Sequence, residues 1–157
     1  MRPQLLKRAI VVAGFAVLGS SSGAALAADP DWKAVEQALG KPGQLQAGDV
    51  FRVGMPRTDL SVTVKSVAVK AGFRLGSYAA FRQGGSHHGA DFVLLDKEVN
   101  AVARTLLQQG IDVTAIHNHG LMDTPRLFYM HFWANDDPAK LAQGLKAALD
   151  HTNSAKP

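Results

Sequence analysis

A leader-like N-terminus and the absence of cysteine set the strongest limits on the fold of this chain. Three basic residues precede the apolar run at residues 9–19, and an Ala-Leu-Ala sequence follows at 25–27. This three-part pattern is typical of a secretory signal peptide, so we expect cleavage after Ala27 and a periplasmic or secreted protein. A secreted chain without cysteine has no disulfides. Residues 28–157, which number 130, must therefore be held together by one hydrophobic core.

An uncleaved membrane anchor is the alternative interpretation of the leader. The apolar run has 11 residues, whereas a helix that spans a bilayer needs about 20. No second long apolar segment follows it, so we expect no integral membrane segment after cleavage.

Composition excludes several classes of function. The formal net charge is +4, of which the leader contributes +3, so the remaining chain carries only +1 and a nucleic-acid partner is not expected. Without cysteine there are no thiolate metal sites, iron–sulfur clusters or cysteine nucleophiles. Phosphate-binding loops with Gly-Lys-Ser/Thr, G-x-S-x-G turns and H-E-x-x-H helices are also missing from the sequence.

The hydrophobic pattern predicts a mixture of strands and helices. Alternating or β-branched runs predict strands, and apolar residues at helical spacing predict helices. A mostly antiparallel sheet with helices packed on one face follows, which makes a single α+β domain over residues 28–157. The predicted strands are 50–55, 60–69, 74–83, 90–95, 111–119 and 126–134, and the predicted helices begin near Pro30, Asp96 and Pro138. In the second of these helices we expect Asp96 to be the N-cap, and an apolar stripe that consists of Val99, Val102, Ala103, Leu106 and Leu107.

Three histidines fall on two consecutive predicted strands. His117 and His119 are two residues apart on one strand and so share a face. His131 lies on the next strand, which a short turn joins as an antiparallel hairpin. If all three rings converge, they suit a divalent transition metal, with zinc favoured and copper or iron as alternatives. A slip of one residue in the hairpin register would instead turn His131 to the opposite face.

Four further residues are candidates for the same site. Glu98 could bind the metal, act as general base or hold an imidazole, although an acidic residue in a first helical turn also favours the helix dipole. Arg57 and Asp59 could bind a carboxylate or phosphate, or could form a structural ion pair. Tyr129 could line a ligand pocket beside the histidines.

Several of these segments carry a family resemblance. Residues 113–119 with their His-Asn-His sequence, 130–132 with Met-His-Phe, and 56–60 with Pro-Arg-Thr-Asp-Leu resemble the LppY/LpqO family of exported bacterial proteins. The resemblance covers roughly residues 32–149 and implies the same fold and the same histidine face. It implies no established reaction, because this family is a domain of unknown function. The lipid anchor in the family's name is not implied, because the chain has no cysteine to carry it.

Two functions follow as expectations. The first is an exported protein that binds a metal through His117, His119 and His131, and, if it is an enzyme, uses a metal-activated water for hydrolysis while Glu98 moves the proton. The second is a metal-free module in which the histidines, Arg57 and Tyr129 line a pocket for a small anionic or cell-wall-derived molecule.

Overall fold

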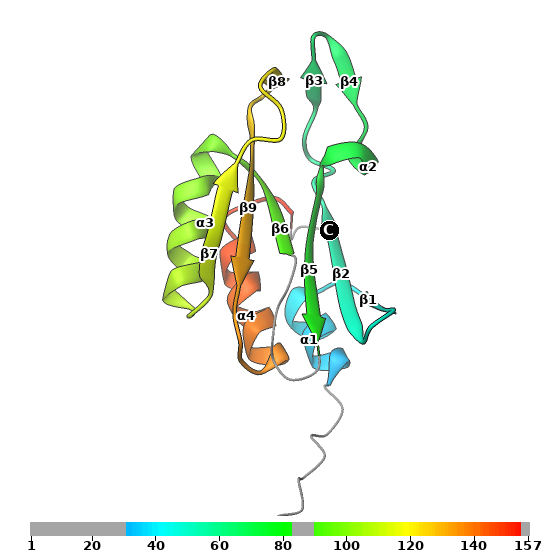
Figure 1. Cartoon of the computed structure of the whole chain (residues 1–157), viewed down its shortest axis with the longest axis vertical. Helices are drawn as coiled ribbons and strands as arrows, with labels where there is room; N and C mark the ends of the chain where they lie inside the picture. The colour runs from blue at the N-terminus through cyan, green and yellow to red at the C-terminus, as the bar shows by residue number, and fades with distance from the viewer. Residues whose placement is uncertain (1–30, 83–89, 155–157) are drawn as a thin grey trace, which may run out of the picture.

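The computed structural model describes residues 31–82 and 90–154 (Figure 1). The predicted signal peptide and the Gly-rich segment that contains His87 and His88 lie outside these residues. Within them, no helix is both long enough and apolar enough to cross a membrane.

A six-stranded sheet forms the centre of the structure. Its strand order is β1-β2-β5-β6-β9-β7, and every neighbouring pair is antiparallel. The strands are β1 (Gly43–Gln46), β2 (Val50–Pro56), β5 (Gly76–Arg82), β6 (Ala90–Leu95), β7 (Asp112–His117) and β9 (Leu127–Trp133). The long helices α1 (Trp32–Leu39), α3 (Asp96–Gln108) and α4 (Pro138–Leu149) cover one face of this sheet, which confirms the predicted α+β class (Figure 1).

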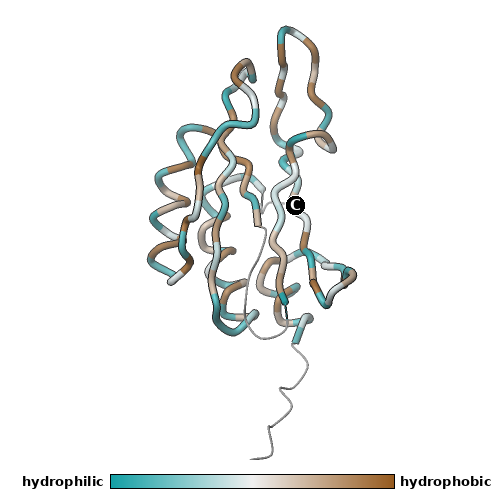
Figure 2. The backbone as a smooth tube through the Cα atoms, viewed as in Figure 1, coloured by the Kyte–Doolittle hydropathy of each residue, from teal (hydrophilic) through white to brown (hydrophobic). Residues whose placement is uncertain are grey.

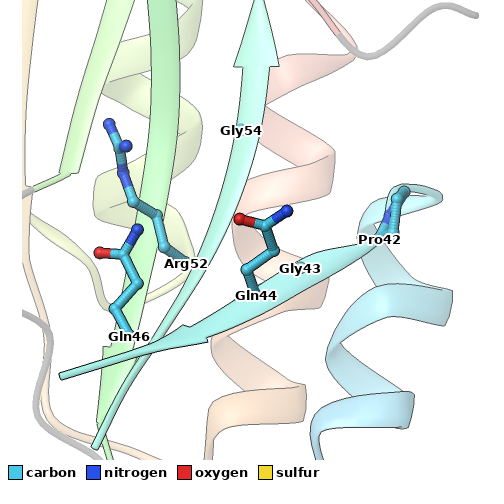
Figure 3. Close-up of a pocket in the computed structure, with 6 residues that line it drawn as sticks. All are labelled: Pro42, Gly43, Gln44, Gln46, Arg52 and Gly54. Atoms are coloured by element: carbon cyan, nitrogen blue, oxygen red, sulfur yellow. The ribbon is translucent and has the colours of Figure 1, made fainter.

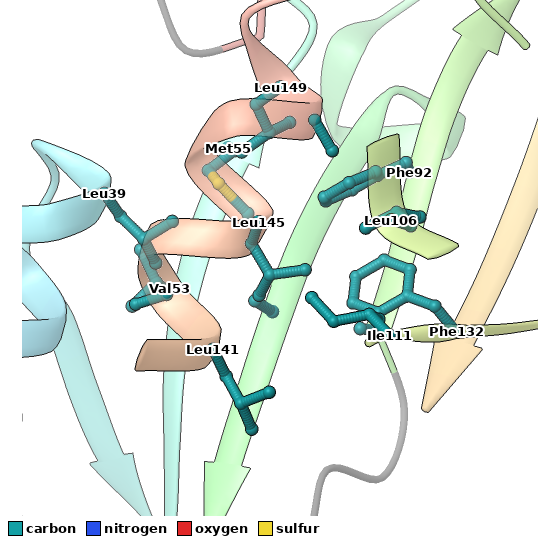
Figure 4. Close-up of a cluster of buried hydrophobic side chains, with 14 of the residues drawn as sticks. Leu39, Val53, Met55, Phe92, Leu106, Ile111, Phe132, Leu141, Leu145 and Leu149 are labelled. Carbon is teal, nitrogen blue, oxygen red and sulfur yellow. The ribbon is translucent and has the colours of Figure 1, made fainter. Parts of the chain in front are cut away.

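The main core lies between that sheet face and the three long helices (Figure 4). Alternate residues of β2, β6 and β9 point into it, as the period of a half-buried strand requires. Phe92 and Phe132 pack with their ring centroids 4.6 Å apart at its centre. The strand contribution includes Val53, Met55, Phe92, Leu94, Met130 and Phe132, and the helices add Val35, Leu39, Val102, Leu106, Leu141, Leu145 and Leu149.

A second, three-stranded sheet lies against the other face, and it corrects one prediction. Residues 60–69 are not one strand but the hairpin of β3 (Val62–Val64) and β4 (Val67–Val69), and β8 (Asp123–Thr124) pairs with β3. Lys65 and Ser66 both have positive φ, at 46° and 69°, which is the backbone of a tight hairpin turn. A smaller apolar cluster beneath this sheet contains Val62, Leu75, Val93, Leu127 and Tyr129.

This arrangement leaves part of the second face of the six-stranded sheet without a covering layer. The small sheet and the short helix α2 (Ala71–Arg74) lie toward one end of β2, β5 and β9 (Figure 1). Beyond them, Arg52, Gly54 and His117 on the same sheet face are exposed. We call this uncovered part the open face.

Two local features were not predicted correctly. The predicted helix cap Asp96 is instead the first residue of α3, and Leu95 occupies the N-cap position. The edge strand β1 was not predicted. Gly43 is required there because a Cβ atom would lie 2.3 Å from the Phe51 ring.

Helix α3 offers a direct test of the core. Its hydropathy alternates between hydrophobic and hydrophilic around the helix (Figure 2). Leu106 is fully buried, whereas its neighbour Leu107 is 58% exposed although both fit the predicted apolar stripe. We expect Leu106→Ala to lower the free energy of unfolding by about 2–5 kcal/mol in urea denaturation. The matched variant Leu107→Ala should change it by less than about 0.5 kcal/mol; equal effects would contradict this packing.

Candidate metal centre

Strand β9 brings the candidate site together because it pairs with both β6 and β7. His131 on β9 lies opposite Asp91 of β6 on one side and Ala115 of β7 on the other. His117, the last residue of β7, lies opposite Tyr129. Cross-strand partners point to the same face, so the side chains of Asp91, His117 and His131 all lie on the open face.

An irregularity in β7 determines which way His117 points. The register between β7 and β9 shifts between Val113 and Ala115, so two residues of β7 oppose one of β9. Val113 packs against the main core, and regular alternation would turn His117 toward the helices as well. The extra residue reverses the alternation and directs His117 to the open face.

The three predicted metal ligands lie close together. One ring nitrogen from each of His117, His119 and His131 lies within 4.8 Å of the other two. The Nε2 atoms of His117 and His131 are 2.7 Å apart, which is the distance of a hydrogen bond between the two rings. One ion with Zn–N distances of 2.0–2.1 Å needs its ligand nitrogens about 3.4 Å apart. Small rotations of these rings, two of which are exposed, would meet that requirement.

Asp91 positions the His131 ring and was not predicted from the sequence. Its Oδ1 lies 2.5 Å from Nδ1 of His131. That oxygen is buried and has no hydrogen bond of regular geometry among the described residues, so the imidazole is its polar neighbour. A carboxylate on Nδ1 leaves Nε2 free to bind a metal, which is the usual outer support of a histidine ligand. The signal was present, since Asp91 is the only acidic residue in the apolar strand 90–95.

His119 lies beyond the end of β7 and is held by stacking. Its ring packs on Tyr129 with centroids 3.5 Å apart and planes 11° apart. Burial and the nearby His117 lower its pKa, which favours the neutral form that binds metals. The side chain of Asn118 donates a hydrogen bond of 2.6 Å to the carbonyl of Leu127 and ties this segment to β9.

Gly120, the residue after His119, lies close to an ion pair. A Cβ atom at Gly120 would lie 2.6 Å from the guanidinium of Arg74 and 2.8 Å from the carboxylate of Asp123. Those two side chains form an ion pair of 3.2 Å, and Tyr129 donates a hydrogen bond of 2.9 Å to the carbonyl of Arg74. The segment that carries His119 is therefore packed between Tyr129 and this ion pair.

The structure places Arg57, Asp59 and Glu98 in a separate ion-pair cluster, in which Arg57 and Glu98 are buried and Asp59 is exposed. Arg57 is fully buried, and it donates two hydrogen bonds to Asp59, two to Glu98 and one to the carbonyl of Val93. Glu98 also accepts a hydrogen bond of 2.8 Å from the backbone N–H of Leu95 at the start of α3.

This cluster corresponds to the structural alternative weighed for Arg57 and Asp59. Glu98 is not part of the histidine group, and its oxygens are already bound by Arg57 and Leu95. A proton-transfer role for Glu98 stays a prediction without a contact to support it. Arg57 has no exposed surface with which to meet a ligand, and Tyr129 is 3% exposed beneath His119.

Acidification tests this ion-pair cluster. Hydrogen bonds from Arg57 hold the pKa of Asp59 below its usual value of 3.8. The ionised carboxylate therefore stabilises the fold above that value, and the contribution is lost as the pH falls through the lower folded pKa. We expect Asp59→Asn to lower the free energy of unfolding at neutral pH by about 1–2 kcal/mol and to weaken its decline below about pH 4.

Urea denaturation across this pH range measures the effect. Asp112→Asn, at an exposed carboxylate, is the control and should leave the profile unchanged. An identical pH profile for the wild type and Asp59→Asn would contradict the role given to this carboxylate.

The support that Asp91 gives to His131 is also testable. Asp91→Asn removes the negative charge that lies beside Nδ1 of His131, so it should reduce zinc affinity about 10–100-fold. Competition with a chelating dye measures this affinity. Asp112→Asn, on the same sheet but away from the rings, should bind zinc like the wild type. Equal affinities for the wild type and Asp91→Asn would show that Asp91 does not support a ligand.

Comparison with known proteins identifies a family without an assigned function. Neither the curated proteins nor the solved structures contain a significant match to the chain. A family model described as Domain of Unknown Function (DUF1259) matches residues 33–151. That match spans both sheets and all three histidines. The chain therefore belongs to the DUF1259 family of domains of unknown function.

Proposed function

We propose that this protein binds a divalent transition metal, with zinc favoured, through His117, His119 and His131. The observation that carries the proposal is the grouping of three ring nitrogens within 4.8 Å on one sheet face. Neutral imidazole is a good ligand for zinc, copper and iron. We further propose that the protein acts outside the cytoplasm as a member of the LppY/LpqO group, on the basis of the leader pattern and the shared motifs.

The surroundings of the rings support a metal more than a metal-free pocket. His131 has a carboxylate on its second nitrogen, and His119 has a lowered pKa. The carboxylate leaves Nε2 of His131 available for a metal, and the lowered pKa favours the neutral form of His119. Three protein ligands leave a fourth position for water or a substrate group, as in catalytic zinc sites. The alternative ligand pocket lacks an accessible cation at Arg57, since that side chain is fully buried.

Metal binding should appear as increased stability. Zinc at about 100 times its dissociation constant adds roughly 2.7 kcal/mol, which for a domain of this size raises the melting temperature by about 10 °C. The measurement is thermal melting of protein made without a histidine tag, in chelator and then with added zinc, together with elemental analysis.

A double variant identifies the ligands. His117→Ala/His119→Ala should abolish both the shift and the bound metal. The control is His151→Ala, because His151 contacts Thr105 on α3 and is not part of the group. If zinc shifts the double variant as much as the wild type, the metal binds elsewhere and the proposal is wrong. If zinc shifts neither protein, metal-free binding replaces it.

A further inference from the structure

A second, polar site lies on the same sheet face at the other edge of the sheet. A pocket of about 280 Å³ lies over β1 and β2. Gln44, Gln46 and Arg52 project from these strands on the side away from α1 and α4 (Figure 3). The volume is just below the range of sites for drug-sized molecules, so the pocket suits one small group. It is lined by Pro42, Gly43, Gln44, Gln46, Arg52 and Gly54.

The charge of this pocket comes from one arginine that is not neutralised. Arg52 is exposed and forms no ion pair within the described residues. Its guanidinium lies 4.1 Å above the ring of Tyr78, which orients it without using up its N–H donors. None of the described residues that line the pocket is acidic. A single oriented guanidinium fits a group with one negative charge, such as a carboxylate.

Two glutamines add neutral hydrogen-bonding groups beside this charge. Gln44 is the register partner of Arg52, and Gln46 follows two residues later on the same face. Both side chains are exposed. Each primary amide supplies donors and an acceptor, which is the combination that recognises hydroxyl groups.

Gly54 provides the space for a ligand. It lies in the middle of β2 on the open face, and a Cβ atom there would have no atom within 4 Å. Its φ is not positive, so the backbone does not require glycine at this position. Glycine inside a strand weakens the strand, and it often marks a place where a ligand approaches the backbone closely.

The sheet register connects this pocket to the histidines. Gly54 pairs with Tyr78, Tyr78 with Asp91, and Asp91 with His131. These four positions form one row across four strands, about 14 Å long at the usual strand spacing. Since paired residues share a face, a ligand that fills the pocket can extend along Tyr78 toward the metal centre.

We propose that this pocket binds a sugar-sized hydroxylated carboxylate, of the uronic acid class. Arg52 binds the carboxylate, and the amides of Gln44 and Gln46 bind hydroxyl groups. The assignment of this pocket does not depend on the histidines. The pocket could also anchor one end of an acidic saccharide whose other end lies at the metal. Only this extension rests on the proposed function.

Titration with D-glucuronate, followed by ¹H–¹⁵N NMR of the purified protein, tests the pocket. We expect shifts centred on the amides of Gln44, Gln46 and Gly54. D-glucose lacks the charge and acetate lacks the hydroxyl groups, so each should bind with an affinity at least about tenfold lower than that of glucuronate. No saturable shift with glucuronate, or equal shifts with acetate, would overturn the proposal.

Two variants test separately the charge of Arg52 and the space above Gly54. Arg52→Met removes the guanidinium and keeps an unbranched side chain, and Gly54→Val fills the pocket without removing any ligand contact. Each should weaken glucuronate binding by about tenfold or more. Gly54→Val should not lower the melting temperature, because the added side chain meets open space and favours a strand. Gly76→Ala, also at an open strand position, is the control and should bind normally. Unchanged binding in both test variants would overturn the proposal.

Zinc separates this proposal from the proposed function. If glucuronate binds to a protein that takes up no zinc, the pocket stands and the metal proposal fails. If zinc binds but glucuronate does not, only the pocket is overturned. When both bind, the His117→Ala/His119→Ala variant should keep the shifts at Gly54 while losing zinc; loss of both would show that the pocket depends on the metal centre and overturn its independent assignment.

Discussion

The pairing of β9 with β6 on one side and β7 on the other is the constraint on which the candidate site depends. It supplies His131 from β9, Asp91 from β6 and His117 from β7, and it directs all three to one face. The opposite face of β9 contributes Met130 and Phe132 to the main core. The strand is therefore held by burial on one side while its other side carries the polar groups. A register error would expose the core residues, so packing also protects the geometry of the rings.

A buried ion-pair cluster anchors the end of the same sheet. Arg57 follows β2, and Glu98 belongs to the first turn of α3, so their contact joins two segments that are 41 residues apart. Breaking a buried pair is costly because it leaves an uncompensated charge, even where the intact pair adds little net stability. Arg57 and Glu98 are residue types that also occur in catalytic sites, but here their contact joins two parts of the fold. Their distinguishing property is burial, which the sequence does not show.

The open face combines two kinds of polar group with a shared backbone row. Imidazoles and Asp91 lie at one edge, and the other edge carries two amides and the guanidinium of Arg52, which has no ion pair with any described residue. The hairpin of β3 and β4 packs near Tyr129, and the four positions of this row are exposed at Gly54 and half-buried at Tyr78, Asp91 and His131. Metal binding and recognition of an acidic saccharide would thus use the same surface of one rigid sheet, whose helical face provides the stability.

Hydrophobic periodicity and residue chemistry are local properties, and so the sequence was enough to predict the α+β class, most strands and helices, and three histidines as candidate ligands. It did not reveal the hairpin within residues 60–69, since two β-branched runs around a polar pair also fit one long strand. The direction of His117 depends on the tertiary structure, because an extra residue in β7 sets it. The tertiary structure also pairs Asp91 with His131 and buries Glu98 against Arg57. Those contacts join residues far apart in the chain, and their geometry depends on register and packing that no local pattern specifies.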